Sequence, residues 1–206
     1  MKKNRNYFYY LIPVILGFIL GYYNPEGKLD FIVQKSAARS VSNYDGWRTN
    51  LKLARNDQGM LMRGIVARIG LGANTKEEAI YLSARKDSEG QRLNSANEYK
   101  IILDEAIPVD AFWSITLYGG DDYLIKTDYN KYGVSSFQNL ETRGDGRIVL
   151  TLSKNKPEND ANWIPLPKDD QDLTLTLRCY NPQEKMLNDL NNVKLPVVKK
   201  VIKGEI

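Results

Sequence analysis

Two acidic clusters are the residues in this sequence whose type and spacing could hold a metal ion. The clusters are Asp121, Asp122 and Asp128, and Asp169, Asp170 and Asp172. Carboxylate oxygens are the ligands that Ca²⁺ prefers, and such a site needs no histidine. Neither cluster has the spacing of an EF-hand loop, so solvated loop tips are the simpler interpretation of both. We expect no cofactor, with Ca²⁺ bound by Asp121, Asp122 and Asp128 as the alternative.

The segment Ala161–Pro167, with sequence ANWIPLP, is the candidate ligand-binding loop. Pro165 and Pro167 fix the backbone, while Trp163 beside Asn162 offers a flat apolar surface next to an amide, which suits a sugar or another flat ligand. The competing interpretation is that Trp163 closes one end of the core and Asn162 caps a turn.

Three further residues complete the predicted ligand site: Trp113, Tyr81 and Arg68. Trp113 and Tyr81 fall in alternating strand patterns, so core packing competes with ligand binding for both. Arg68 follows Arg63 by five positions in a predicted helix, and a solvated surface charge is the competing interpretation.

The sequence contains no histidine and a single cysteine, Cys179. These absences exclude Ser-His-Asp and Cys-His nucleophilic catalysis, imidazole metal ligands and an intramolecular disulfide. Cys179 lies in an apolar strand pattern, which predicts a buried thiol. A glycosidase needs only two carboxylates, but the predicted strands offer no inward-facing pair. We therefore expect a protein that is not an enzyme.

Composition and charge describe an ordinary folded domain with a short appendage. Of the 206 residues, 42% are hydrophobic and 26% are charged. Lys2, Lys3 and Arg5 supply three of the 29 cationic residues, which leaves 26 against 25 acidic ones in the rest of the chain. A nearly neutral body without a basic stripe argues against nucleic acid as a partner.

The N-terminal run Tyr7–Tyr23 carries no charge and follows the three cations. Tyrosines cluster at both ends of this run, as expected at the two membrane–water boundaries. Because the region lacks a good cleavage site, a transmembrane signal anchor over residues 1–24 is favoured over a cleaved signal peptide. The cations predict an N-terminus in the cytoplasm and a domain on the periplasmic side of a bacterial inner membrane.

The remaining chain is predicted as a lead-in of mixed helical character (residues 25–60) and a mainly β domain (residues 61–206). An amphipathic helix is expected over Leu61–Leu71, because apolar residues recur four apart. Short alternating runs separated by turn signals then predict an antiparallel β-sandwich. The predicted elements are Ala79–Ala84, Tyr99–Leu103, a hairpin over Pro108–Ile125, Ile148–Ser153, Leu173–Tyr180 and a short helix Gln183–Asp189.

Five motifs in this order resemble the bacterial domain-of-unknown-function family 1214: RGIVARIGLGAN, EEAIYLSARKDSEGQRL, PVDAFWSITLYGGDDYLI, ANWIPLP and LRCYNP. The resemblance covers residues from Trp47 to Val201. It implies a jelly-roll-like β-sandwich, often joined to a domain of the 1254 family, which we expect this short, membrane-anchored form to lack. It implies no activity.

The sequence therefore predicts a membrane-anchored envelope protein that serves as a non-catalytic binding or interaction module. Its expected partner is a small molecule, a glycan or an envelope protein. A carbohydrate-active hydrolase with paired carboxylates is the alternative. A packing subunit of an envelope complex is a third hypothesis, and it would expose a large apolar patch.

Overall fold

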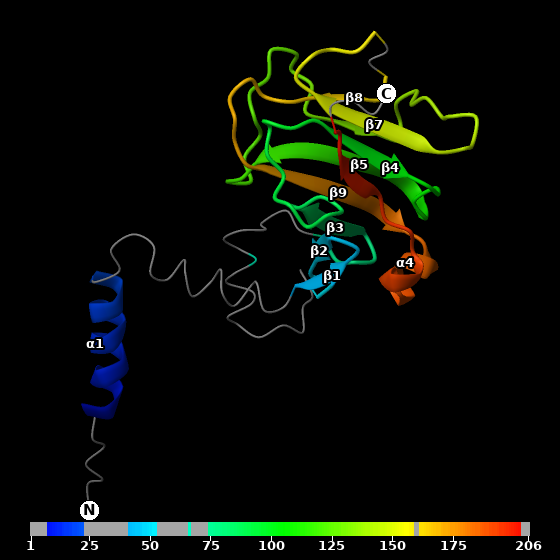
Figure 1. Ribbon diagram of the computed structural model, residues 1–206. Coiled ribbons are helices and arrows are strands. Elements are labelled where there is room, and N and C mark those ends of the chain that lie inside the picture. Colours follow the sequence, from blue (N-terminus) through cyan, green and yellow to red (C-terminus); the bar gives the residue numbers. More distant parts are fainter. Residues whose placement is uncertain (1–7, 23–40, 53–65, 67–73, 159–160, 203–206) are drawn as a thin grey trace, which may run out of the picture. The chain divides into compact units, whose positions relative to one another are not determined.

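The computed structural model describes residues 8–22, 41–52, 66, 74–158 and 161–202 (Figure 1). The chain divides into two compact units, Met1–Ser40 and Val41–Ile206. In the first unit, helix α1 spans Phe8–Tyr22 and includes Pro13. The second unit contains every described strand.

The predicted transmembrane helix Tyr7–Tyr23 is only partly described, because both of these end residues lie outside the described ranges. Helix α1 has 15 residues. None of the helices within the described ranges is long and apolar enough to span a bilayer, so a single transmembrane helix finds no support there.

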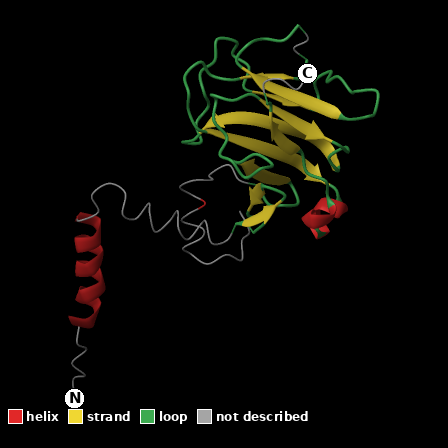
Figure 2. Cartoon of the chain, in the orientation of Figure 1, coloured by secondary structure: helices red, strands yellow, loops and turns green. Residues whose placement is uncertain are grey.

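The second unit consists of two β-sheets (Figures 1 and 2). In spatial order, the six-stranded sheet contains β1 (Ser42–Tyr44), β2 (Trp47–Thr49), β3 (Ala79–Ala84), β9 (Leu173–Pro182), β5 (Val109–Gly119) and β6 (Gly133–Ser135). The four-stranded sheet contains β10 (Val197–Lys200), β4 (Tyr99–Leu103), β7 (Ile148–Ser153) and β8 (Trp163–Pro165). The mainly β prediction is confirmed, but this strand order does not establish the jelly-roll connectivity that the resemblance implied.

Strands with strict alternation form where the sequence predicts them. Strands β3, β4 and β7 have the predicted bounds, and β9 extends the predicted strand to Pro182. The short C-terminal helix is α4 (Glu184–Asn188), and the 3-10 helix η1 (Leu190–Asn192) follows it. The predicted helix Leu61–Leu71 lies outside the described residues except for Val66. The lead-in 25–60 contributes strands β1 and β2, and β2 pairs with β3.

The predicted hairpin over Pro108–Ile125 forms only in part, because its turn is present but its second strand is not. The return segment pairs with β5 through a single bridge between Tyr118 and Leu124. Strand β5 is instead paired with β9 on one edge and with β6 on the other, where Ser114 lies opposite Ser135. Because β6 occupies that edge, only the C-terminal end of β5 is open to the return segment.

The prediction of purely antiparallel sheets is wrong at β8, which pairs in parallel with β7. Strand β8 is formed by part of the segment predicted as a binding loop. Its Pro165 cannot donate a ladder hydrogen bond, which restricts this segment to a sheet edge. Strand β8 does occupy the edge of the four-stranded sheet.

The core lies between the two sheets and combines their apolar inner faces. In β9, Leu173, Leu175, Leu177 and Cys179 alternate with outward residues and are almost fully buried. Cys179 is fully buried, which confirms the predicted buried thiol, and this burial raises the pKa of the thiol to about 12. The Nε1–H of buried Trp47 donates to the carbonyl oxygen of Pro196 at 2.7 Å, which ties the start of the sandwich to its C-terminal segment.

Candidate functional site

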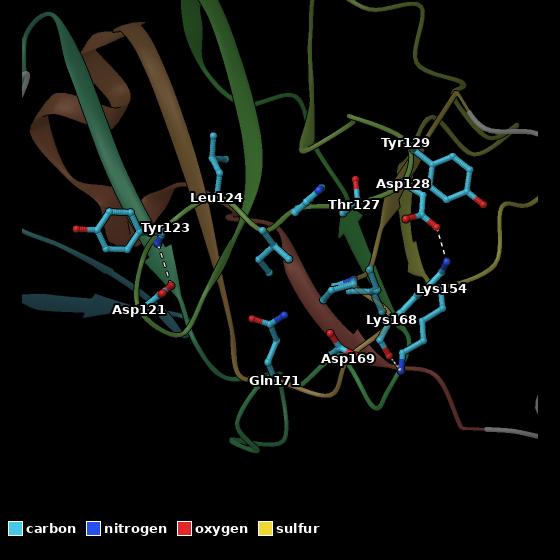
Figure 3. Close-up of a pocket in the computed structure, with 14 residues that line it drawn as sticks. Asp121, Tyr123, Leu124, Thr127, Asp128, Tyr129, Lys154, Lys168, Asp169 and Gln171 are labelled. Carbon is cyan, nitrogen blue, oxygen red and sulfur yellow. Dashed lines mark hydrogen bonds and ion pairs between the residues drawn. The ribbon is translucent and has the colours of Figure 1, made fainter.

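A cleft of about 460 Å³ opens between two loops of the sandwich (Figure 3). We call it the Tyr129 cleft. The loop Asp121–Tyr129 follows β5, the loop Leu166–Gln171 joins β8 to β9, and Lys154 follows β7. Its volume lies in the range of small-ligand sites, about 300–1,000 Å³.

Exposed aromatic side chains border a buried floor. Tyr123 is 75% exposed and Tyr129 is 49% exposed, and Figure 3 shows them at opposite sides of the cleft. Ile125, Thr127 and Leu166 are buried and belong to the base of the cleft. Exposure of aromatic rings to water is unfavourable, and a ligand that packs an apolar face on these rings would cover them.

The charged lining is mixed. Lys126, Lys154 and Lys168 line the same cleft as Asp121, Asp128 and Asp169. Lys168 Nζ lies 2.5 Å from Asp128 Oδ2, and this hydrogen bond raises the pKa of Lys168. Lys154 Nζ donates to the carbonyl oxygen of Lys168 and to Asp170 Oδ1, each at 2.8 Å. Lys126 makes no ion pair with any residue in the described ranges, so its ammonium group is open to a ligand.

Two glycines begin the first loop, and both lie close to aspartate side chains. A Cβ at Gly119 would lie 2.7 Å from Asp121 Oδ1, and a Cβ at Gly120 would lie 2.8 Å from Asp172 Cβ. Asp121 Oδ1 also accepts the backbone N–H of Tyr123 at 3.1 Å. Glycine at 120 therefore lets the loop lie directly against Asp172, whereas the Asp121 carboxylate beside Gly119 could move aside.

Trp163 is a buried residue that packs against Tyr129 of the cleft. Its side chain is 1% exposed, and Nε1–H donates to Ser153 Oγ at 3.0 Å. Its ring meets the ring of Tyr129 edge to face, with centroids 4.7 Å apart. Trp163 thus packs in the interior and orients a residue that lines the cleft.

Asn162 is a structural residue of a turn. Its Oδ1 accepts the backbone N–H of Glu141 at 2.8 Å, and its Nδ2 donates to the carbonyl oxygens of Glu141 at 2.8 Å and Val149 at 3.1 Å. The amide also borders a separate hollow of about 280 Å³ beside Arg143.

The structure does not gather the other predicted ligand-binding residues around Trp163. Trp113 is 5% exposed and packs in the core. Tyr81 lies on β3 in the six-stranded sheet, where burial, and to a smaller extent Tyr180, raises its pKa. Arg68 lies outside the described residues.

The first acidic cluster is divided between two places. Asp121 and Asp128 line the Tyr129 cleft, whereas Asp122 has a positive φ of 65° and pairs with Arg85. Across the described ranges, no group of three or more acidic or thiol side chains could hold a metal ion. The Ca²⁺ alternative gains no support there.

Sequence reasoning missed Tyr123, Lys126, Tyr129 and Lys168 as lining residues. Tyr123, Lys126 and Tyr129 share a signal, because they recur three residues apart in the segment 123–131, YLIKTDYNK, directly after a Gly-Gly-Asp-Asp turn. The sequence pattern instead predicts the beginning of this segment as the second strand of a hairpin. Lys168 lies outside this segment and follows the ANWIPLP motif.

The fold and the cleft together define a β-sandwich domain with an aromatic-bordered polar cleft. Residues 78–184 match the family model described as "Protein of unknown function (DUF1214)". The chain belongs to this family, as the resemblance implied. No curated protein matches the chain.

The solved structures that are similar to the chain include the following two. The VPA0106 protein from Vibrio parahaemolyticus has a TM-score of 0.59 at 24% identity, over 71% of this chain and 36% of its own. A putative uncharacterized protein from Burkholderia cenocepacia has a TM-score of 0.41 at 16% identity, over 63% of this chain and 31% of its own. The chain thus spans about a third of the length of these proteins, and the first likeness shows the fold.

Proposed function

We propose that the sandwich is a non-catalytic binding module whose Tyr129 cleft takes a glycan. The observation that carries this proposal is the pairing of exposed tyrosines with unburied cations and carboxylates in one cleft. Sugar rings present apolar C–H faces that pack on aromatic rings, and their hydroxyl groups exchange hydrogen bonds with charged side chains. Tyr123 and Tyr129 supply the first kind of contact, and Lys126 supplies the second.

A carbohydrate hydrolase is the alternative function. Asp121, Asp128 and Asp169 line the same cleft, and glycoside hydrolysis needs two carboxylates. The binding module is preferred because Asp128 is engaged by Lys168 and Asp121 by the backbone of Tyr123. Incubation with a bound oligosaccharide and assay of new reducing ends separates the two functions. The binding module leaves the sugar intact, and the hydrolase releases reducing ends that Asp128→Asn abolishes.

We propose that α1 holds the chain at the bacterial inner membrane, with the sandwich on the periplasmic side. The apolar run Tyr7–Tyr23, the cations Lys2, Lys3 and Arg5 before it, and the exposed apolar side chains of α1, among them Phe18, support this proposal. The full chain should remain in the membrane pellet after carbonate washing, and protease added to spheroplasts should digest the sandwich. Recovery of the full chain in the carbonate supernatant would contradict the membrane association.

A thermal-shift screen of oligosaccharides against the full chain in mild detergent tests the glycan proposal. A ligand at 100 times its Kd stabilises the folded state by about 2.7 kcal/mol. For a domain of this size that raises the Tm by roughly 5–10 °C.

Variants locate the binding site. Tyr123→Ala should raise the Kd of the best sugar about tenfold, equivalent to about 1.4 kcal/mol. Phe137→Ala is the matched control, because Phe137 is 73% exposed and does not line the cleft. Equal affinities of Tyr123→Ala and the wild-type chain for the sugar would show that the glycan does not bind in this cleft.

A further inference from the structure

Arg178 lies on the outer face of the six-stranded sheet and does not line the Tyr129 cleft. It belongs to β9, which has β3 on one side and β5 on the other. In this register Arg178 stands opposite Tyr81 of β3 and Ser114 of β5. The alternation of β9 directs this residue outward, because Leu177 and Cys179 on either side are fully buried.

Neutral groups hold the guanidinium group of Arg178. Nη1 donates to Thr116 Oγ1 at 3.1 Å, and Nη2 donates to the Tyr118 hydroxyl at 2.6 Å. The guanidinium carbon also lies 5.5 Å from the centroid of the Tyr118 ring. These two hydrogen bonds use two of the five N–H groups of the side chain.

No carboxylate of the described chain pairs with Arg178, although the residue is only partly exposed. A half-buried cation without a counter-ion has lost part of its hydration without regaining a charge partner. The two neutral acceptors fix the plane of the guanidinium group but leave its charge uncompensated. Such an arrangement is suited to an incoming anion, which arginine binds through paired N–H groups.

A hollow of about 300 Å³ lies beside this guanidinium group. Its other lining residues are hydroxyl-bearing side chains and one ion pair: Ser83, Tyr118, Thr174, Thr176, Arg85 and Asp122. The Arg85 charge is engaged by Asp122, which leaves Arg178 as the uncompensated charge of the hollow. The hydroxyl of Thr174, a residue that is 2% exposed, has no hydrogen-bond partner within the described structure.

We propose that this hollow binds an oxyanion group, a carboxylate, phosphate or sulfate, carried by a ligand of the sandwich. Arg178 supplies the charge and the N–H groups that its two hydrogen bonds leave over, and Thr176 supplies a hydroxyl donor at the border of the hollow. The oxyanion site shares no lining residue with the Tyr129 cleft. It is therefore a second site, and it stands whether or not the cleft binds a glycan.

Titration of the full chain with sodium phosphate, sulfate and acetate, at constant ionic strength set by chloride, tests the oxyanion site. The readouts are the side-chain Nε–H NMR resonances of arginine and the Tm. At least one of the three anions should shift the Arg178 resonance saturably. Saturation with phosphate or sulfate would indicate a site for a tetrahedral oxyanion, and saturation with acetate would indicate a site for a carboxylate.

Arg178→Gln should lower the affinity for that anion at least about tenfold, because the single uncompensated charge is lost. Arg147→Gln is the control with the same charge change, because Arg147 is also partly exposed but is already paired with Asp145. Arg178→Lys should also weaken binding, because an ammonium group lacks the planar fork. If Arg178→Gln fails to fold, Tyr118→Phe tests the same site by freeing the guanidinium group, and a severalfold weaker affinity is expected. Shifts that do not saturate, or equal affinities in all variants, would overturn the proposal.

Discussion

At the residue scale, the sandwich places its aromatic side chains in two roles. Trp47, Trp113 and Trp163 are almost fully buried, whereas Tyr123 and Tyr129 project at the cleft. The tryptophans each carry one N–H that must find an acceptor in the interior, and two of them do so through a backbone carbonyl. The tyrosines can keep a hydroxyl group in water while their rings pack on a ligand. The division of roles follows from how each ring satisfies its polar atom.

Trp163→Phe tests the supporting role of that residue. The substitution removes the donor to Ser153 and changes the edge contact with Tyr129, so we expect a loss of about 1–3 kcal/mol in the free energy of unfolding. Urea denaturation measures it, with Tyr123→Phe as a surface control that should change stability by less than about 0.5 kcal/mol. Equal stability of the two variants would show that Trp163 is dispensable to the fold.

Cys179 makes the stability of the sandwich decrease with pH in the alkaline range. Burial raises the pKa of its thiol from 9.0 to about 12, so the folded state keeps a proton that the unfolded chain releases. The stabilisation is complete below pH 9 and is lost as the pH rises toward 12, by at most about 1.4 kcal/mol per pH unit. Cys179→Ala should flatten this part of the pH profile in urea denaturation. Parallel profiles for the two proteins between pH 9 and 11 would contradict the burial of a neutral thiol.

At the element scale, the sequence predicts the two central strands, β5 and β9, but not the strands with which they pair. Alternation in Leu173–Tyr180 determines which side chains face inward, and it predicts β9 almost to its ends. The partner of β5 depends on a contact between residues far apart in sequence, which local periodicity does not encode. The short strand β6 has too few residues to show a period, so the sequence predicts the return segment as the edge partner of β5, although that segment bridges β5 only at Tyr118 and Leu124. Local periodicity does not predict the cleft either, because its two loops meet only in the folded chain.

Gly133 tests the pairing of β5 with β6. A Cβ at this position would lie 2.2 Å from the carbonyl oxygen of Ile115 and 2.9 Å from Thr116 Cα, both backbone atoms that cannot move alone. Gly133→Ala should therefore cost about 1–3 kcal/mol in the free energy of unfolding. Gly144→Ala is the matched control, because nothing lies within 4 Å of its Cβ. A neutral Gly133→Ala would refute the close approach of β6 to β5.

At the scale of the whole molecule, the sandwich carries its own core. The chain divides between Ser40 and Val41, and the second unit encloses the buried cluster shared by both sheets. Trp47 and Pro196, near the two ends of this unit, are joined by a buried hydrogen bond. The sandwich therefore has the interior and the closing contacts that an independent domain needs.

Residues 41–206 expressed alone should fold as a monodisperse protein without detergent. Size-exclusion chromatography with light scattering and a single cooperative thermal transition measure this outcome. Trp47→Phe in the same fragment should lower its Tm, because the carbonyl of Pro196 loses its buried donor. Aggregation of the fragment would mean that residues 1–40 contribute to the fold.

The central claim is that the Tyr129 cleft receives a glycan, and mapping the bound sugar on the chain tests it most directly. Backbone amide shifts of the labelled protein are recorded while the best oligosaccharide from the screen is added to saturation. We expect the largest shifts in the loops Asp121–Tyr129 and Leu166–Gln171, with the sugar recovered unchanged. Largest shifts around Asn162 or on the outer face of β9, with both cleft loops unmoved, would contradict the claim.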